Sequence, residues 1–306
     1  MTDDGGGTDI STSAIVVTWN SADVIDDCLT SLRAALPPVG AEVIVVDNGS
    51  RDDTVVRVRS AHPDVVLIAN EDNRGLAAAN NQGLAAARGE RYLICNPDVL
   101  VHAGAIEAMV AVLGRHPQAA WVVPRVLHED GALQTSAGDL PTLRETLLGR
   151  QAARRRSPGS PTGFWWDGWA HDTEQVIGRG FECAYLVRRS AVAAVGPQDE
   201  RYRLDWEGLD WTERFRRAGW EIWLSPEAEV THLGGTSRRQ VPFRSIRSQH
   251  KGMYLYFSDR RGAAWKPVLA IAFTVRGLIK TALTALGVPF YSWGHRDRRD
   301  HRAGSA

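Results

Sequence analysis

The sequence has few cysteines, no net charge and no glycine-rich phosphate-binding loop, and each absence excludes a class of function. Its three cysteines, Cys28, Cys95 and Cys183, lack the spacing of a metal site, which favours buried thiols in a reducing compartment. Thirty-six basic side chains balance 36 acidic ones, so no overall field attracts nucleic acid, and no nucleic-acid partner is expected. Neither a G-x-G-x-x-G pattern nor a loop ending in Gly-Lys-Ser/Thr follows the first predicted strand, which argues against a nicotinamide enzyme and against an ATPase.

The first residues do not have the pattern of a secretion signal. Residues 1–9 are acidic and glycine-rich, and they have neither a basic start nor an apolar core. We therefore expect residues 1–12 to be disordered and the protein to be cytoplasmic.

Residues 15–95 alternate short apolar runs with segments of helical periodicity. Buried strands are predicted at 15–19, 42–46, 65–69 and 91–95. Helices are predicted after Asn20, after Ser50 and over 76–88, and Ser50 and Asp53 have the spacing of a capping box. The connections are too long for hairpins, so the pattern predicts an α/β fold with a mostly parallel central sheet flanked by helices.

Polar residues follow each of these strands at the point where it ends. The clusters occupy 18–21, 47–50, 70–74 and 96–98. Because the carboxyl ends of parallel strands meet at one edge of a sheet, the clusters are expected to form one pocket. Pro97 cannot lie inside a central strand, so Asp98 is placed in the turn, where it is the predicted ligand of a divalent metal. Seen alone, Asn-Pro-Asp is more often only a turn, and Asp47 could equally accept hydrogen bonds from a nucleoside or belong to a helix-capping turn.

A second group of polar signals lies between residues 178 and 237. Three acids, Asp205, Glu207 and Asp210, are predicted in a turn ahead of a helix at 212–218, where the helix dipole favours negative charge and some of them could merely cap. A strand predicted at 221–224 leads on to His232. A lone histidine beside glycines is usually structural, but with a metal suspected at Asp98 it is also a candidate ligand or phosphate contact.

Several motifs in register give the chain a family resemblance over roughly residues 14–260. They are VVTWN at 16–20, VVDNGSRDDT at 45–54, NRGLAAANNQGL at 73–84, NPDVLV at 96–101, LVRRSA at 186–191, DERY at 199–202, RRAGW at 216–220 and HLGGTS at 232–237. On these motifs the chain resembles the family 2 glycosyltransferases with a GT-A fold, and most closely their rhamnosyltransferase-like bacterial branch. The resemblance implies a catalytic domain over 13–237, with a nucleotide-sugar half at about 13–125 and an acceptor half at about 126–237, followed by a basic and apolar helical extension over 238–306.

The resemblance implies an inverting transfer of a sugar, with a rhamnose-like sugar favoured, from a nucleotide-diphosphate sugar to a hydroxyl of a glycan or lipid-linked acceptor. The donor would be a dTDP- or UDP-sugar. Magnesium or manganese at Asp98, with His232 as a further ligand, would neutralise the leaving diphosphate. The residues implied in donor binding are Thr18, Asn20, Asp47, Asn48, Asn73, Arg74, Asn96 and Asp98.

The chain departs from its relatives at the expected catalytic base. They usually carry Glu-Asp with a further acid two residues on, and that Asp is the base, whereas this chain reads Glu207-Gly208-Leu209-Asp210. Glu207, Asp205 or Asp210 could take over the role, helped by the backbone freedom of Gly208. The alternative is a non-catalytic or weakly active nucleotide-sugar-binding relative. A nucleotidyltransferase fits less well, because the chain lacks a glycine-rich, lysine-containing N-terminal loop for a triphosphate.

The segment 265–287 is strongly apolar but contains Arg276 and Lys280. Two cations within about twenty residues argue against a membrane-spanning helix. A helix that lies in a membrane interface, anchored by Trp265 and Trp293, and a helix packed onto the catalytic domain are equally compatible with the pattern. Residues 262–293 are therefore a candidate for peripheral contact with the inner face of the cell membrane.

Overall fold

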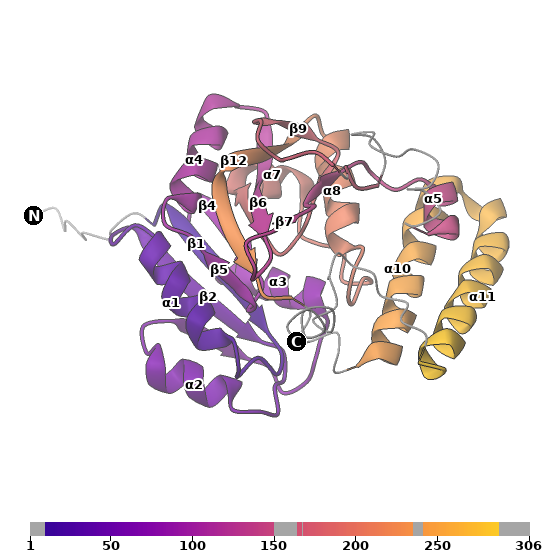
Figure 1. Ribbon diagram of the computed structural model, residues 1–306, viewed down its shortest axis with the longest axis horizontal. Helices are drawn as coiled ribbons and strands as arrows, with labels where there is room; N and C mark the ends of the chain where they lie inside the picture. Colours follow the sequence, from indigo (N-terminus) through magenta and orange to yellow (C-terminus); the bar gives the residue numbers. More distant parts are fainter. Residues whose placement is uncertain (1–9, 150–163, 167, 235–240, 288–306) are drawn as a thin grey trace, which may run out of the picture.

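A central sheet carries helices on both faces, and a helical hairpin is attached at one end of it (Figure 1). The computed structural model describes residues 10–149, 164–166, 168–234 and 241–287. The main sheet has the order β3-β2-β1-β4-β11-β6-β12-β5, with β7 beside β6 and β9 beside β12, and a separate small sheet pairs β8 with β10. The strands are β1 (Thr12–Thr18), β2 (Ala41–Asp47), β3 (Val66–Ala69), β4 (Arg91–Cys95), β5 (Val99–Val101), β6 (Ala119–Leu127), β7 (Leu133–Gln134), β8 (Ala137–Gly138), β9 (Gln175–Ile177), β10 (Arg179–Gly180), β11 (Ala184–Arg188) and β12 (Glu221–His232).

Helices cover both faces of the sheet because successive apolar residues of the strands point to opposite sides. On one face, Val16 joins a buried cluster with α1 and α4; on the other, Ile15 joins a cluster with α3, α7 and α8. The helices are α1 (Ile25–Ala35), α2 (Thr54–Ala61), α3 (Leu76–Ala86), α4 (Ala105–Arg115), α5 (Leu143–Leu148), α7 (Arg189–Val195), α8 (Glu207–Arg217), α10 (Pro242–Arg261), the short 3-10 helix η1 (Ala263–Trp265) and α11 (Lys266–Ala285).

The N-terminal half of the sheet is parallel and places its strand ends along one edge. β1 pairs in parallel with β2 and β4, and β2 pairs in parallel with β3. The register sets Thr18 beside Asp47, and Asp47 beside Ala69. Strand β11 is antiparallel to β4 and β6, whereas β12 runs parallel to β6. The predicted fold class, a mostly parallel sheet flanked by helices with a helical C-terminal extension, is confirmed.

The second helix begins later than its capping-box pattern predicted. α2 starts at Thr54, and its N-cap residue, Asp53, makes no side-chain capping bond. The hydroxyl of Ser50 instead donates a hydrogen bond to Asp47 at 2.5 Å. The capping-box prediction was wrong because Ser50 is used to hold the carboxylate at the end of β2.

The helix of the second polar region begins at Glu207 rather than at residue 212. The two residues before it, Asp205 and Trp206, have left-handed backbone conformations, with φ of 64° and 73°. The Trp206 ring packs against Tyr256 and Phe257 of α10, and this tertiary contact fixes the turn. Glu207 and Asp210 therefore lie in the first turn of α8 and not in a turn ahead of it. The strand predicted at 221–224 is also longer, since β12 continues through a register shift to His232.

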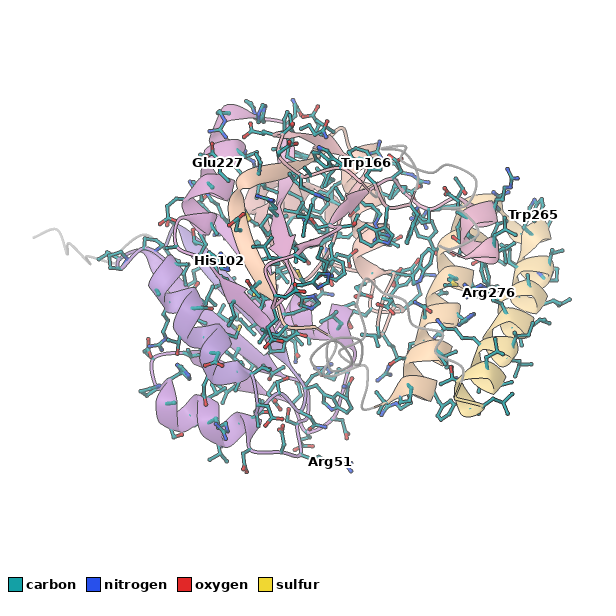
Figure 2. The ribbon with its side chains drawn as sticks, in the orientation of Figure 1. Arg51, His102, Trp166, Glu227, Trp265 and Arg276 are labelled. Atoms are coloured by element: carbon teal, nitrogen blue, oxygen red, sulfur yellow. The ribbon has the colours of Figure 1, made fainter. Side chains whose placement is uncertain are left out.

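The C-terminal extension is a hairpin of α10 and α11. Leu269 and Phe273 of α11 are buried in a cluster that also contains Trp206 before α8. Two of the three cations of α11 also face inward: Arg276 donates to Nε2 of His250 at 2.8 Å, and Lys280 donates to Gln249 at 2.8 Å. Figure 2 shows Arg276 where α11 faces α10. The helix thus packs onto the rest of the protein through one face only.

The opposite face of α11 is apolar and exposed. Its large exposed hydrophobic residues are Val268, Ile271, Val275, Leu278 and Ile279. By length and composition the segment Ala263–Ala285 could cross a membrane. Arg276 and Lys280 face α10 and Lys266 lies at the start of the helix, so these cations do not exclude membrane contact through the exposed face. Trp293, the second predicted anchor, lies outside the described residues.

Candidate active site

One corner of the site is the carboxylate of Asp47 at the end of β2. Asp47 is 1% exposed and accepts hydrogen bonds from the Thr18 hydroxyl and the Ser50 backbone N–H, both at 2.9 Å. These bonds join the ends of β1 and β2 to the turn that follows. Asp47 therefore shapes this corner of the edge as well as offering an acceptor to a ligand.

Asn48 ties the next loop to this corner. Its side-chain oxygen accepts from the backbone N–H of Arg74 at 2.8 Å, and its amide nitrogen donates to the carbonyl of Gly75 at 3.2 Å. Oδ1 of Asn73 accepts from the Gly75 N–H at 3.1 Å, and Arg203 donates to the Asn73 carbonyl at 2.6 Å. The loop that the resemblance places near the donor is thus held between β2 and the turn before α8.

Asn20 fixes the turn after β1. Its backbone is left-handed, with φ of 48°, and its N–H donates to the Ser50 hydroxyl at 2.8 Å. Its Oδ1 accepts from the backbone N–H of Arg51 at 2.8 Å, and the Arg51 side chain extends away from the protein (Figure 2). These bonds give Asn20 a positioning role at this edge.

The second corner is formed by Asp98, just before β5, and His232, at the end of β12. The antiparallel register sets His232 beside Val99, and Nε2 of His232 lies 3.5 Å from Oδ2 of Asp98. The two side chains are only 9% and 8% exposed. Nδ1 of His232 lies 3.2 Å from Oε1 of Gln134, and this contact orients the ring so that Nε2 faces the carboxylate. An imidazole nitrogen and a carboxylate oxygen at this separation are both potential ligands of one divalent metal ion.

A metal at this corner would have two protein ligands. Within the described ranges, no group of three or more His, Cys, Asp or Glu side chains could hold a metal ion. Magnesium sites that act on nucleotides commonly use one or two protein ligands and complete their coordination with phosphate oxygens and water. Asp98 and His232 fit a metal whose remaining ligands come from a diphosphate.

Asn96 turns the chain at the end of β4 over the three cysteines. Its N–H donates to the Cys183 carbonyl at 2.7 Å, and its carbonyl accepts from the thiols of Cys95 at 3.3 Å and Cys28 at 3.5 Å. All three thiols are free and buried. A hydrogen bond with Cys28 and burial raise the pKa of Cys95 well above its usual range. The thiols therefore pack beneath the Asn-Pro-Asp turn, and the raised pKa keeps Cys95 in its neutral form.

A pair of glutamates, Glu182 and Glu207, marks a third part of the edge. Glu207, the first residue of α8, is 3% exposed. Glu182 precedes β11, and a Cβ built on Gly208 would lie 2.0 Å from its Oε2 and 2.1 Å from its Cδ. Burial, followed by the charges of Glu182 and Glu207, raises the pKa of Tyr185 well above its usual range. Sequence reasoning missed Glu182, because no local motif marks it and its neighbour Gly208 lies far along the chain.

The other two candidate bases are placed differently. One carboxylate oxygen of Asp210 accepts from Arg214 and the other from Arg260, each at 2.9 Å. The first pair lies within α8 and the second joins α8 to α10, and together they favour a structural role for Asp210. Asp205 lies in the left-handed turn ahead of α8, beside the buried Trp206.

Residues 13–170 match glycosyl transferase family 2. The chain belongs to this family. This family 2 glycosyltransferase is 30% identical over 283 residues to the N-acetylglucosaminyl-diphospho-decaprenol L-rhamnosyltransferase of Mycobacterium tuberculosis, a match that covers 86% of this chain and 88% of the relative.

Solved structures share its GT-A fold. A crystal structure of GalNAc-T7 with UDP, GalNAc and Mn²⁺ matches with a TM-score of 0.55 at 15% identity, over 81% of this chain and 50% of that chain. The mannosyltransferase PcManGT from Pyrobaculum calidifontis, in complex with GDP-Man and Mn²⁺, matches with a TM-score of 0.54 at 18% identity, over 91% of this chain and 77% of that chain. The predicted family and the prediction of a glycosyltransferase are confirmed.

Proposed function

We propose that this family 2 glycosyltransferase transfers a sugar from a dTDP- or UDP-sugar to a hydroxyl of a glycan or lipid-linked acceptor. The transfer inverts the configuration at the anomeric carbon, and a rhamnose-like sugar is favoured. The observation that carries the proposal is that the Asp47 corner and the Asp98–His232 pair share one sheet edge. The first corner suits the nucleoside end of a donor and the second suits its diphosphate. The 30% identity to an L-rhamnosyltransferase supports the choice of sugar.

Magnesium or manganese is the proposed cofactor, with Asp98 and His232 as its protein ligands. The ion would supply a positive charge that neutralises the leaving diphosphate. The protein holds its two ligands ready for this role, since the contact with Gln134 orients the imidazole and burial restricts both side chains. Asn96 contributes the turn that brings Asp98 to the edge.

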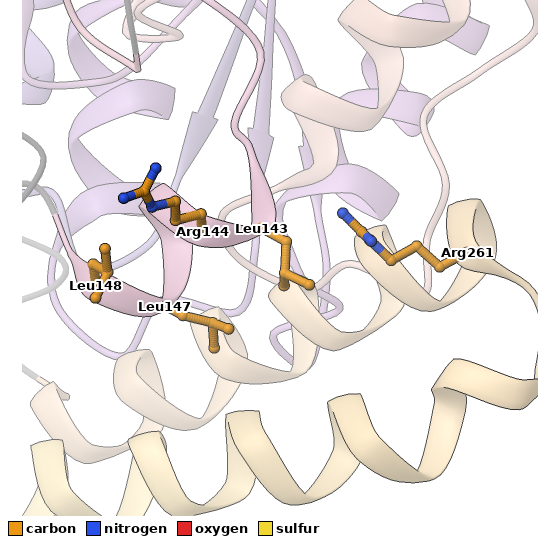
Figure 3. A pocket seen from close by; sticks show the side chains of 5 residues that line it. All are labelled: Leu143, Arg144, Leu147, Leu148 and Arg261. Carbon is orange, nitrogen blue, oxygen red and sulfur yellow. The ribbon is translucent and has the colours of Figure 1, made fainter.

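The proposed acceptor is lipid-linked, and the proposed location is the inner face of the cell membrane. A shallow pocket of about 530 Å³ lies between α5 and the end of α10, and it is lined by Leu143, Arg144, Leu147, Leu148 and Arg261 (Figure 3). Leucine side chains suit hydrocarbon, and guanidinium groups suit phosphate. The pocket lies beside α11, whose outer face is apolar, and Trp265 marks the start of that helix (Figure 2). Together these surfaces suit a membrane-bound, phosphate-carrying acceptor.

The test uses the purified protein with dTDP-L-rhamnose, UDP-sugars and GDP-mannose as donors and N-acetylglucosaminyl-diphospho-polyprenol as acceptor. Transfer is followed by mass spectrometry of the acceptor, with Mn²⁺, with Mg²⁺ and with EDTA. We expect one dTDP- or UDP-sugar to be transferred with inverted configuration and EDTA to abolish the transfer. Binding of a donor without transfer to any acceptor would support the non-catalytic alternative instead. Full activity in EDTA would refute the metal requirement while leaving the transferase assignment intact.

A further inference from the structure

Position 208 has no side chain, and the space where one would begin is filled by the carboxylate of Glu182. A Cβ built on Gly208 would lie 2.0 Å from Oε2, 2.1 Å from Cδ and 2.5 Å from Oε1 of Glu182. All three distances are too short for non-bonded atoms, so the carboxylate occupies this volume only because residue 208 is glycine. The position of the Glu182 carboxylate therefore depends on the absence of a side chain at residue 208.

Glu182 emerges at the same sheet edge as the proposed metal corner. The Asn96 N–H donates to the carbonyl of Cys183 at 2.7 Å, which places residue 182 opposite the turn that carries Asp98. The neighbouring Phe181 packs edge-on against His232, with ring centroids 5.3 Å apart. Phe181 thus contacts the metal corner, whereas the carboxylate of Glu182, in the turn before β11, reaches α8 at Gly208.

The environment of Glu182 suits a carboxylate that works in its ionised form. Gly208 lies in the first turn of α8, an 11-residue helix whose N-terminal dipole stabilises negative charge. Glu182 is half-buried, whereas Glu207 is only 3% exposed. Both oxygens of Asp210 are bound by guanidinium groups.

We propose that Glu182 is the general base of the transfer reaction. This inference rests on the proposed function. The acceptor hydroxyl loses its proton to the Glu182 carboxylate while its oxygen forms a bond to the anomeric carbon. The bond from that carbon to the diphosphate oxygen breaks, and the nucleoside diphosphate leaves with the electron pair. Glu182 then releases the proton to solvent, which restores the carboxylate.

The first test replaces each carboxylate by its amide. We expect Glu182→Gln to lower kcat by at least about 100-fold, because general-base catalysis typically contributes that much or more. The acidic limb of the pH–rate profile should disappear, while the Kd for UDP or dTDP and the melting temperature stay at wild-type values. Glu227→Gln, an exposed glutamate on β12, is the matched control and should keep the wild-type rate. A wild-type rate in Glu182→Gln, or a loss confined to Glu207→Gln, would overturn the inference.

The second test moves the carboxylate back to the helix. Glu182→Gly should be inactive, and the double variant Glu182→Gly/Gly208→Asp should regain at least about tenfold over it, because the new carboxylate starts where that of Glu182 now lies. A double variant that remains as inactive as Glu182→Gly, although folded and able to bind nucleotide, would contradict the inference. If the wild type itself transfers no sugar from any donor in the panel, the proposed function fails and the assignment of a base fails with it. If the wild type is active and Glu182→Gln equally so, only the base assignment fails.

Discussion

Gly208→Ala tests the link between the missing side chain and the activity, because it adds only one methyl group. Non-bonded contacts to a Cβ essentially never fall below 3.0 Å, so the 2.0 Å separation from Oε2 of Glu182 must open by at least about 1 Å. A displacement of about 1 Å of a reacting group can lower a rate by on the order of 100-fold. We therefore expect kcat to fall by about two orders of magnitude while the Kd for nucleoside diphosphate is unchanged.

The same variant should fold at least as well as the wild type. Position 208 is helical and its φ is not positive, so alanine should stabilise α8 by up to about 1 kcal/mol relative to glycine. Displacing the flexible end of Glu182 offsets part of this gain. Gly114→Ala in α4 is the matched control, because a Cβ there meets no atom within 4 Å, and it should keep the full rate.

The assay compares initial transfer rates with thermal unfolding of the same preparations. A Gly208→Ala variant that is as stable as the wild type and transfers at the wild-type rate would refute the reasoning, because the Glu182 carboxylate could then move without consequence. A variant that loses activity together with its fold would also fail to match the expectation, which requires the two properties to separate.

Three further predictions concern the metal, the hairpin and the membrane. Asp98→Asn should lower kcat by at least about 100-fold and remove the Mn²⁺-induced rise in melting temperature measured with UDP. Burial lowers the pKa of His250 to about 4, so the unfolded chain binds a proton below pH 6.5 that the folded protein excludes. Stability should fall between pH 6.5 and 4, by on the order of 3 kcal/mol, and His250→Gln should flatten this fall in thermal unfolding. Ile271→Gln/Leu278→Gln should reduce flotation with anionic liposomes without lowering the melting temperature, because both side chains are about two-thirds exposed; unchanged flotation would contradict membrane contact through α11.

The parallel half of the fold could be predicted from the sequence because its signals are local. Apolar runs of strand length alternate with helical periodicity, and the strand predicted at 91–95 has the observed bounds of β4. Chain direction alone then places the four polar clusters on one edge. Asp98 could be assigned to a strand-end turn for the same reason, since Pro97 excludes it from the strand itself.

The parts that were predicted wrongly depend on tertiary contacts. The start of α8 is set by Trp206, which packs against α10, and no pattern within residues 200–212 shows this contact. Ser50 matched a capping box but is used to bind Asp47, because the end of β1 brings Thr18 to the same carboxylate. The orientation of α11 also depends on its partner helix, which draws Arg276 inward.

The non-catalytic alternative rested on the absence of an acid at position 208. In the structure, the carboxylate of Glu182 lies where a side chain at position 208 would begin. A site needs a carboxylate at a point in space, and two chain positions can supply it if they meet there. Glycine at position 208 removes the expected carboxylate from α8. The same glycine leaves the space that the carboxylate of Glu182 occupies. An aspartate at 208 together with Glu182 would place two acids in overlapping positions, which sterics forbid and charge repulsion disfavours. Residues 182 and 208 are therefore expected to change together among related sequences. Here the acid expected at position 208 is replaced by glycine and a carboxylate is supplied by Glu182, which favours an active enzyme over a non-catalytic relative that only binds the nucleotide sugar.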